Sequence, residues 1–375
     1  MIPDTTLAGR RVIIGLSGGV DSAVAAFLLK RQGAAVEALH MTNWDDEDGY
    51  CTAADDLQDA RHVCGQLEIP LHHANFSKDY RESVFEHFLC EYAAGRTPNP
   101  DVLCNREIKF GVFRRYAQRL GAELIATGHY ARVTREGDST VLMKAHDVGK
   151  DQTYFLHAVD RQALADTVFP LGELQKHGVR EVAREVGLHV HDKKDSTGIC
   201  FIGERPFREF LSQYLPANPG PMLDADGVEV GEHHGLMYYT VGQRQGLGIG
   251  GRRDGGDEPW YVIDKRLADN ALIVAQGEHP LLYSSAVRVS DPHWIGAAPA
   301  TTGRWEGHVK IRYRQPDQQC TVDFLPDGTL GVGFAKPQRA VAPGQYAVFY
   351  QDDRCLGGGV IEQVQAHAEA LRPAV

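Results

Sequence analysis

VIIGLSGGVDSAVAAFLL, residues 12–29, is the stretch of sequence that decides the fold. Its start, Val12–Leu16, predicts a short buried strand, because it is largely apolar and runs directly into a glycine turn. The apolar run Ala23–Leu29 predicts a helix that begins at Asp21-Ser22. Glycines let the backbone approach a ligand closely, and free N–H groups at a helix start bind anions. The stretch therefore predicts a phosphate-binding turn between a strand and a helix.

The glycine spacing separates this turn from two common nucleotide loops. A Walker A loop needs G-x-x-x-x-G-K-[ST], and no lysine occurs in residues 15–22. The dinucleotide fingerprint needs G-x-G-x-x-G, whereas Gly18 and Gly19 are adjacent. SGGVDS after a strand resembles the pyrophosphate loop of ATP pyrophosphatases, which split ATP into AMP and pyrophosphate and adenylate an oxygen of their substrate. This resemblance implies that ATP is the nucleotide.

Strand and helix patterns alternate over the first 130 residues. Strands are predicted at Val12–Leu16, Ala35–Met41, Leu71–Asn75 and Leu124–Thr127, and helices at Ser22–Arg31, Ala53–Leu67, Tyr80–Ala94 and Glu107–Leu120. This order predicts an α/β domain with a mostly parallel sheet, whose ligands bind at the carboxyl ends of the strands. The phosphate loop, Met41 and Gly128-His129 all fall at such ends, as a nucleotide site requires.

The pattern changes twice further along the 375-residue chain, which is too long for one typical core. Leu174–Gly187 predicts a helix, and after Pro206 a Gly-rich β pattern follows, with a hairpin turn at Asp226-Gly227. Six short strands then predict a small closed barrel, at Ala286–Val289, Gly307–Tyr313, Cys320–Leu325, Leu330–Phe334, Tyr346–Tyr350 and Gly357–Val364. The predicted domains are residues 1–205 (nucleotide-binding), 206–275 (small mixed central domain) and 276–375 (C-terminal β-barrel).

The composition predicts a cytoplasmic enzyme. Hydrophobic residues make up 43% of the chain and charged residues 24%, and no stretch is long enough to span a membrane or to form a signal peptide. The net charge of −11 argues against a general polyanion binder. Between Arg96 and Arg135, however, eight basic residues stand against three acidic ones, which is either a solvated helix face or a local binding surface.

The seven cysteines are scattered, odd in number and without a C-x-x-C pair. They therefore predict neither a secreted disulfide scaffold nor a structural zinc site. The histidines match no zinc spacing either, so no resident metal is predicted. Cys64 and Cys90 lie in helical patterns and Cys320 in a strand pattern, where small buried hydrophobic residues are common.

Two cysteines lie instead in predicted loops beside cations. Cys104 follows a turn-rich segment before the basic helix, and Arg106 and Lys109 near a helix start should lower its pKa. Cys200 follows Lys193-Lys194 closely. Either thiol alone is more often inert than catalytic. Two accessible thiols in the same chain as an adenylating loop indicate sulfur transfer. Adenylation makes an oxygen of the substrate a leaving group, and persulfide sulfur can displace it.

Seven long motifs resemble the bacterial tRNA-specific 2-thiouridylase family from the phosphate loop almost to the C-terminus. They are SGGVDS, TPNPDVLCNREIKFG, ATGHYAR, KDQTYFL, DSTGICFIGERPFREFL, GQRQGLGIGG and RYRQP. The resemblance implies conversion of the 2-oxo group of wobble uridine 34 to 2-thio in tRNAs for Lys, Glu and Gln. It also implies that a protein donor, either a sulfur-relay protein or a cysteine desulfurase, supplies the persulfide.

The resemblance assigns roles to individual residues. Cys200 would carry the persulfide, Cys104 would be the nucleophile that forms a disulfide with it, and Asp101 is our candidate general acid or base. ATP with Mg²⁺ would be held by Gly15, Leu16, Ser17, Gly18, Gly19, Val20, Asp21, Ser22, Met41 and Gly128. The tRNA anticodon loop, with its flipped-out base, would meet Asn99, Pro100, Asp101, His129, Lys150, Asp151, Gln152, Arg312, Tyr313 and Gln345.

Two other classes of protein remain open at this point. An amide ligase that adenylates a carboxylate would share SGGVDS but would need neither Cys104 nor Cys200. A non-enzymatic RNA-binding protein would need the β region but not the phosphate loop. ATP–pyrophosphate exchange, and its dependence on tRNA or on a small acid, separates these cases.

Overall fold

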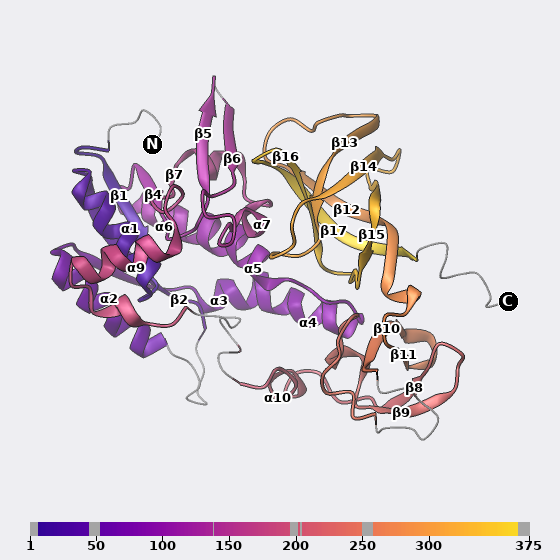
Figure 1. Cartoon of the computed structure of the whole chain (residues 1–375). Helices are drawn as coiled ribbons and strands as arrows, with labels where there is room; N and C mark the ends of the chain where they lie inside the picture. Colours follow the sequence, from indigo (N-terminus) through magenta and orange to yellow (C-terminus); the bar gives the residue numbers. More distant parts are fainter. Residues whose placement is uncertain are drawn as a thin grey trace.

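The computed structural model describes residues 7–44, 53–137, 139–195, 202, 205–249 and 258–366. A five-stranded parallel sheet in the order β3-β2-β1-β4-β7 forms the first part of the chain (Figure 1). Its strands are β1 (Arg11–Gly15), β2 (Ala35–Thr42), β3 (Leu71–Asn75), β4 (Leu124–Ala126) and β7 (Thr167–Val168). The predicted parallel sheet is confirmed.

Three long helices accompany this sheet, and the sequence predicted each of them. They are α1 (Val20–Arg31), α2 (Ala53–Leu67) and α9 (Lys176–Glu185), and both α2 and α9 contact α1. Helix α1 is buried on nearly all sides because its residues are small and apolar. Two short helices, α7 (Thr153–Leu156) and α8 (Arg161–Ala165), and the 3₁₀ turn His189–Asp192 complete this part.

Two composite helical segments lie between the strands β3 and β4. The first consists of α3 (Ser77–Tyr80), a π-helical stretch (Arg81–Phe85) and α4 (Glu86–Ala93). The second consists of α5 (Pro100–Leu103), a π-helical stretch (Cys104–Val112) and α6 (Phe113–Arg119). The sequence predicted that this second helix begins at Glu107. It begins seven residues earlier, because Pro100 takes the first helical position, where its missing N–H is not needed.

The C-terminal strands form the predicted closed barrel. The strands are β12 (Tyr283–Trp294), β13 (Gly303–Lys310), β14 (Gln318–Phe324), β15 (Leu330–Arg339), β16 (Tyr346–Gln351) and β17 (Arg354–Ala366). They follow the order β12-β15-β14-β13-β16-β17, and a β12–β17 pairing closes the ring. Fully buried Val289, Val309, Val322 and Phe349 fill its interior, so inward-facing apolar side chains stabilise the closed form.

A hairpin from the first part of the chain extends this barrel sheet, which the sequence did not predict. Strands β5 (Arg132–Glu136) and β6 (Ser139–Met143) form the hairpin, and β6 pairs with β17 through Leu142 and Cys355 (Figure 1). The buried ammonium group of Lys144, directly after β6, bonds to the Asp317 carboxylate. The hairpin therefore ties the parallel-sheet part of the chain to the barrel.

A four-stranded sheet lies between these parts in the sequence. Its order is β10-β11-β8-β9, from β8 (Gly220–Leu223), β9 (Glu229–His233), β10 (Trp260–Arg266) and β11 (Ala271–Gln276), and α10 (Phe207–Ser212) precedes it. The turn predicted at Asp226-Gly227 joins β8 to β9. Residues 235–249, the described part of the stretch GLMYYTVGQRQGLGIGG, form turns and the 3₁₀ helix Leu236–Tyr238, although a Gly-rich β pattern was predicted after Pro206. Further 3₁₀ turns are Leu267–Asp269 and Pro280–Leu282.

Candidate active site

The loop between β1 and α1 is an anion-binding turn in its geometry. Gly18 has φ +78°, and a Cβ there would lie 2.4 Å from the Asp56 carbonyl oxygen, so only glycine fits. The hydroxyls of Ser17 and Ser22 lie 3.1 Å apart, and the Ser17 N–H donates to the Ser22 oxygen at 3.2 Å. Gly19 caps α1 without a side-chain hydrogen bond, which leaves first-turn N–H groups available to a phosphate.

The other predicted ATP residues surround this loop at the carboxyl ends of β1, β2 and β4. Gly128 packs so tightly that a Cβ would lie 2.8 Å from the Ser22 nitrogen. A Cβ on Gly15 would lie 3.8 Å from the Met41 methyl group. The strands β2 and β4 flank β1. The strands that follow β1 in the chain add first on one side of it (β2, β3) and then on the other (β4, β7), and α/β sheets bind ligands at such a switch in strand order. The structure thus brings the predicted set together.

A charge network at Asp21 was missed by the sequence analysis. The Tyr130 hydroxyl donates to Asp21 at 2.8 Å, and the Lys176 ammonium lies 2.8 Å from both Asp21 oxygens. Lys176 also lies 2.8 Å from Asp195. Of these residues, Lys176 lies in none of the quoted motifs, and its contact with Asp21 spans 155 positions of sequence.

Asp195 forms ion pairs with two further cations and remains ionised. Lys150 contacts it at 2.9 Å and Arg180 at 2.8 Å. Partial burial raises the pKa of the Asp195 carboxyl, but the hydrogen bonds from Lys176 and Lys150 outweigh it and bring this pKa to about 2. The network thus joins the phosphate loop to Lys150, which the resemblance assigned to tRNA.

Lys193, two residues before Asp195, also contacts the phosphate loop. The Lys193 ammonium lies 3.2 Å from the Gly18 carbonyl oxygen, 2.8 Å from Asp56 and 2.5 Å from Asp59. Burial lowers the pKa of Lys193, but the hydrogen bonds that its ammonium donates to the two carboxylates outweigh this effect, so the net shift is upward. Lys193 is therefore a charged tie between the loop and α2.

Cys104 is buried, with 2% of its surface exposed, and it opens the π-helical stretch. The expectation of an accessible loop thiol at this position is wrong in this structure, because the helix begins at Pro100 and carries Cys104 into the core. Such widened helical turns are frequent at functional sites. Next to it, the buried Asn105 amide donates to the Phe155 carbonyl at 3.3 Å. Cys200 lies outside the described residues.

The remaining described cysteines differ from one another in exposure. Burial raises the pKa of Cys64 to about 11 and that of Cys320 to about 12, and it also raises the pKa of Cys355. These three thiols are poor nucleophiles at neutral pH. Cys90 is exposed on α4, contrary to the expectation that its helical pattern buries it.

The segment that precedes α5 is held by the barrel. The Gln345 amide donates to the carbonyls of Thr97 at 2.8 Å and Pro98 at 3.3 Å, and the Asn99 amide lies 3.5 Å from the Gln345 oxygen. The Thr97 N–H donates to the Pro343 carbonyl at 2.8 Å. The predicted base-contacting residues Asn99 and Gln345 are therefore neighbours, although 246 positions separate them.

The candidate acid or base Asp101 occupies the first turn of α5, after buried Pro100. Its side chain is exposed, yet the surrounding protein desolvates the carboxyl and raises its pKa, against a smaller lowering by Lys109. A raised pKa is useful to a proton-transfer group near neutral pH.

Four of the residues that the resemblance assigned to tRNA form a second group. His129 is buried, bonds to Thr127 at 2.7 Å, and burial holds its pKa well below the usual range. Gln152 exchanges two hydrogen bonds of 2.9 Å with the backbone of Tyr130. The Tyr313 hydroxyl lies 3.4 Å from the Lys150 carbonyl oxygen. These residues lie beside the Asp21 network.

The last two members of the tRNA set have local structural contacts. Asp151 is 3% exposed and accepts hydrogen bonds from the Ala145 and Thr153 backbone and from the Thr153 hydroxyl, so it braces its own loop. The Arg312 guanidinium donates to the backbone carbonyls of Arg339 and Ala340, and burial lowers its pKa.

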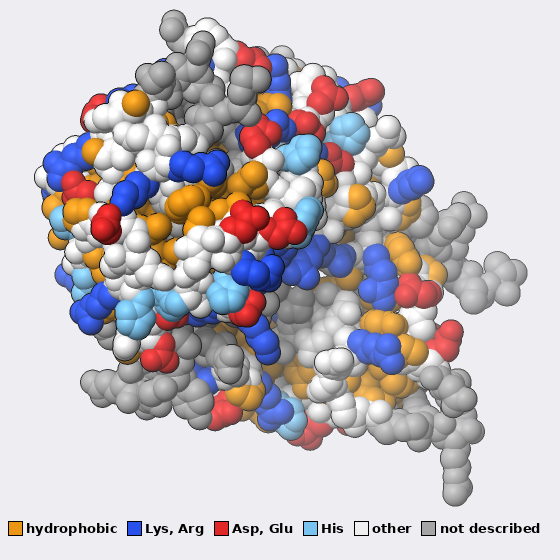
Figure 2. All heavy atoms as spheres, turned by 60° about the vertical axis from the view of Figure 1, so that its left-hand side comes forward, with side chains coloured by type: hydrophobic (Ala, Val, Ile, Leu, Met, Phe, Trp, Pro, Cys, Tyr) orange, Lys and Arg blue, Asp and Glu red, His pale blue; other side chains and the backbone are white. Residues whose placement is uncertain are grey.

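The basic surplus between Arg96 and Arg135 is reduced by carboxylates from outside that range. Arg96 pairs with Glu91, and Arg114 pairs with Asp166. Figure 2 shows Lys and Arg side chains along the recess beside the lobe that faces the viewer. The free positive surface is thus smaller than the sequence count implied.

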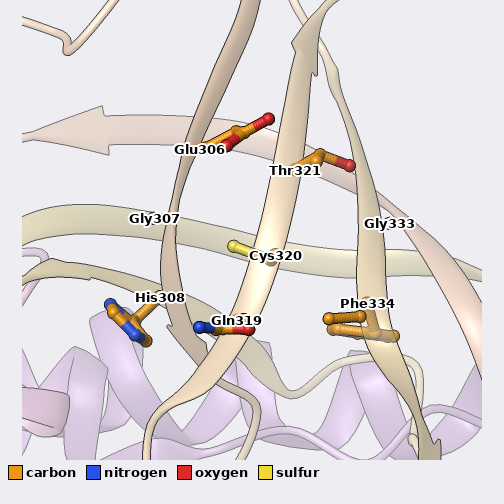
Figure 3. A pocket seen from close by; sticks show the side chains of 9 residues that line it. Glu306, Gly307, His308, Gln319, Cys320, Thr321, Gly333 and Phe334 are labelled. Carbon is orange, nitrogen blue, oxygen red and sulfur yellow. The ribbon is translucent and has the colours of Figure 1, made fainter.

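A hollow of about 520 Å³ lies on β13, β14 and β15 of the barrel (Figure 3). Glu306, His308, Gln319 and Thr321 are among its lining residues. None of the predicted site residues lines it, and it is separate from the phosphate loop. Within the described residues, no helix is both long and apolar enough to cross a bilayer.

Replacement of Gly344 in the barrel by Ala should displace the segment before Asn99. Gly344 has φ +91°, and an added Cβ would lie 2.9 Å from the Thr97 nitrogen, so the segment before Asn99 must shift. Gly328→Ala is the matched control, because it has φ +82° but no atom within 4 Å of an added Cβ. Both variants should lose about 1–2 kcal/mol of unfolding free energy through left-handed strain. Only Gly344→Ala should also raise KM for tRNA, the substrate that the resemblance implies; equal KM values would show that the barrel contact does not shape the site.

The parallel sheet and its loop define a nucleotide-binding domain of the ATP-pyrophosphatase class. A family model described as "tRNA methyl transferase HUP domain" matches residues 10–204. Models described as "tRNA methyl transferase PRC-barrel domain" and "Aminomethyltransferase beta-barrel domain" match residues 208–276 and 284–361.

Curated relatives extend the match over nearly the whole chain. The tRNA-specific 2-thiouridylase MnmA of Hahella chejuensis is 59% identical over 363 residues, which are 96% of this chain and 99% of the relative. The protein of the same name from Pseudomonas fluorescens is 57% identical over 360 residues, 95% of this chain and 96% of the relative. This chain belongs to the tRNA-specific 2-thiouridylase family.

Proposed function

We propose that this chain is an ATP-dependent tRNA uridine 2-sulfurtransferase that converts the 2-oxo group of wobble uridine 34 to 2-thio in tRNAs for Lys, Glu and Gln. The observation that supports it most directly is family membership over almost the full length of both chains. The Lys-free phosphate turn beside a second group of predicted RNA-contacting residues is consistent with it. An amide ligase is disfavoured, because it needs no Cys104 motif.

The chemistry divides between two steps. In the first, the uridine O2 attacks the α-phosphorus of ATP and pyrophosphate leaves, so that O2 becomes part of an AMP leaving group. The described residues fit ATP at the open first turn of α1 and the Gly18–Ser22 backbone. Mg²⁺ would enter with ATP and offset the phosphate charge. The Asp101 carboxyl, whose pKa desolvation raises, would exchange the proton of the base.

In the second step, the outer sulfur of the Cys200 persulfide attacks C2 of the base and AMP leaves. The Cys104 thiolate attacks the inner sulfur of Cys200, so the S–S bond of the persulfide breaks and a Cys104–Cys200 disulfide forms. The electron pair of the broken bond completes the C2 thiocarbonyl. A thiol reductant then restores both cysteines, and a persulfide donor protein reloads Cys200.

The three predicted domains would share this work in the cytoplasm, where the tRNA substrate resides. Residues 1–205 would hold ATP and both cysteines. Residues 206–275 and 276–375 would hold the tRNA, the latter through Arg312, Tyr313 and Gln345. The bonds of Gln345 to the segment before Asn99 support a role of the barrel at the base itself.

ATP cleavage by the purified protein tests the proposal. Unmodified tRNA for Glu should raise the release of AMP and pyrophosphate at least tenfold, because adenylation needs the uridine in place. The same tRNA with cytidine at the wobble position should give no such rise. Mass analysis of its nucleosides should show 2-thiouridine once a persulfide donor is added. Release of ADP and phosphate, or equal stimulation by both tRNAs, would contradict the proposal.

A further inference from the structure

A nucleotide loop without lysine raises the question of which cation offsets the charge of the triphosphate. A helix N-terminus supplies only about half an elementary charge, whereas the loop itself carries the negative charge of Asp21. The Walker A loop solves this problem with its own lysine. In this structure, the cation nearest to the first turn of α1 has to come from another part of the chain.

Lys176, the first residue of α9, directs its ammonium group to the first turn of α1. Its nitrogen lies 2.8 Å from both Asp21 oxygens, and its side chain is only 12% exposed. The Tyr130 ring lies 5.8 Å from the same nitrogen. The backbone N–H of Lys176 donates to the Asp147 carboxylate at 2.8 Å, and this bond fixes the start of α9.

The two carboxylate partners of Lys176 have other hydrogen-bond donors, so the Lys176 ammonium can leave them for another anion. Asp195 has Lys150 and Arg180 as further partners at 2.9 and 2.8 Å, so it retains two cations without Lys176. Asp21 keeps the Tyr130 hydroxyl at 2.8 Å. Asp195 therefore keeps two cations, and Asp21 keeps one hydrogen-bond donor, when Lys176 turns to another anion.

Lys193 has two carboxylate partners, as Lys176 has, but it differs from Lys176 in its contact with the loop. Its ammonium group lies within 2.8 Å of Asp56 and Asp59 on α2, and it contacts the loop at the Gly18 carbonyl oxygen. Lys176 instead contacts Asp21 in the first turn of α1, where free N–H groups would meet a phosphate. Of the two lysines, Lys176 is therefore the better placed to bind an anion at this turn.

We infer that Lys176 is the polyphosphate-binding cation of this ATP site, and that it exchanges the Asp21 carboxylate for the pyrophosphate portion of ATP when the nucleotide binds. The inference rests on the proposed function only in that ATP is the ligand of the loop. It predicts discrimination by phosphate number: Lys176 strengthens the binding of ATP and pyrophosphate, which have the outer phosphates, and not that of AMP, which lacks them.

Nucleotide affinity without tRNA tests this role, with ATP, AMP and inorganic pyrophosphate as the probes in titration calorimetry. Lys176→Met should weaken ATP and pyrophosphate at least 20-fold and change AMP less than twofold. Lys176→Arg, which keeps the charge, should recover part of the ATP affinity. Lys30→Met is the matched control, since Lys30 lies near the other end of α1 and bonds to the Leu67 carbonyl; its affinities should equal those of the wild type.

Two outcomes would overturn the inference. If Lys176→Met weakens ATP and AMP by the same factor, Lys176 only stabilises the loop through Asp21. If it leaves ATP affinity within twofold, another group binds the polyphosphate. Failure of the proposed function looks different, because wild-type protein would then bind ATP and AMP alike or not at all, and the inference would fall with it.

Discussion

Cys104→Ser is expected to abolish tRNA thiolation, with a loss of at least 1,000-fold in single-turnover rate, while ATP–pyrophosphate exchange continues. A hydroxyl cannot form the disulfide that releases sulfur from Cys200, whereas the phosphate loop lies on other elements of the fold. Radiolabelled persulfide from a donor should still load Cys200 in this variant. Cys200→Ser, in contrast, should not take up the label.

Cys90→Ser controls for the loss of a thiol. Cys90 is exposed on α4 and the proposed chemistry does not use it, so activity should be unchanged. Because Cys104 is buried, circular dichroism and the melting temperature of Cys104→Ser must match the wild type for the rate to be interpreted. Normal thiolation by a folded Cys104→Ser protein would show that the assigned roles are wrong.

Gly128→Ala is expected to reduce ATP affinity at least tenfold, equivalent to about 1.4 kcal/mol. The added methyl would lie 2.8 Å from the Ser22 nitrogen and 3.0 Å from the Asp21 carbonyl carbon. Both atoms belong to the backbone and cannot rotate away, so the first turn of α1 must shift, and overpacking of this kind costs about 1–3 kcal/mol. Calorimetric titration with ATP measures the effect.

Gly65→Ala provides the comparison for this substitution. Gly65 lies in α2 and an added Cβ there has no atom within 4 Å, so ATP affinity should not change. The exchange should stabilise the helix by about 0.5–1 kcal/mol, since alanine loses less conformational entropy than glycine. Unchanged ATP affinity in Gly128→Ala would mean that ATP does not depend on the contact between Gly128 and the loop.

The sequence by itself determined the parallel sheet, the position of the phosphate loop and the closed barrel. These features depend on local patterns: short apolar runs that predict strands, a glycine turn at a fixed place and a helix that begins at residues 20–22. The long motifs also identified the family, which the comparisons confirm. The predicted site residues remain predictions, although the structure gathers the described ones around two neighbouring groups.

Only the tertiary structure decided which distant residues share the charge at the loop. Lys176 lies in none of the quoted motifs, and its place beside Asp21 follows from the packing of α9 against α1. The same holds for the bonds of Gln345 to Thr97 and for the burial of Cys104, which depends on where its helix begins. Hydrogen bonds and ion pairs act over about 3 Å in space, and a pattern of neighbours in sequence carries no record of such contacts across 155 or 248 positions.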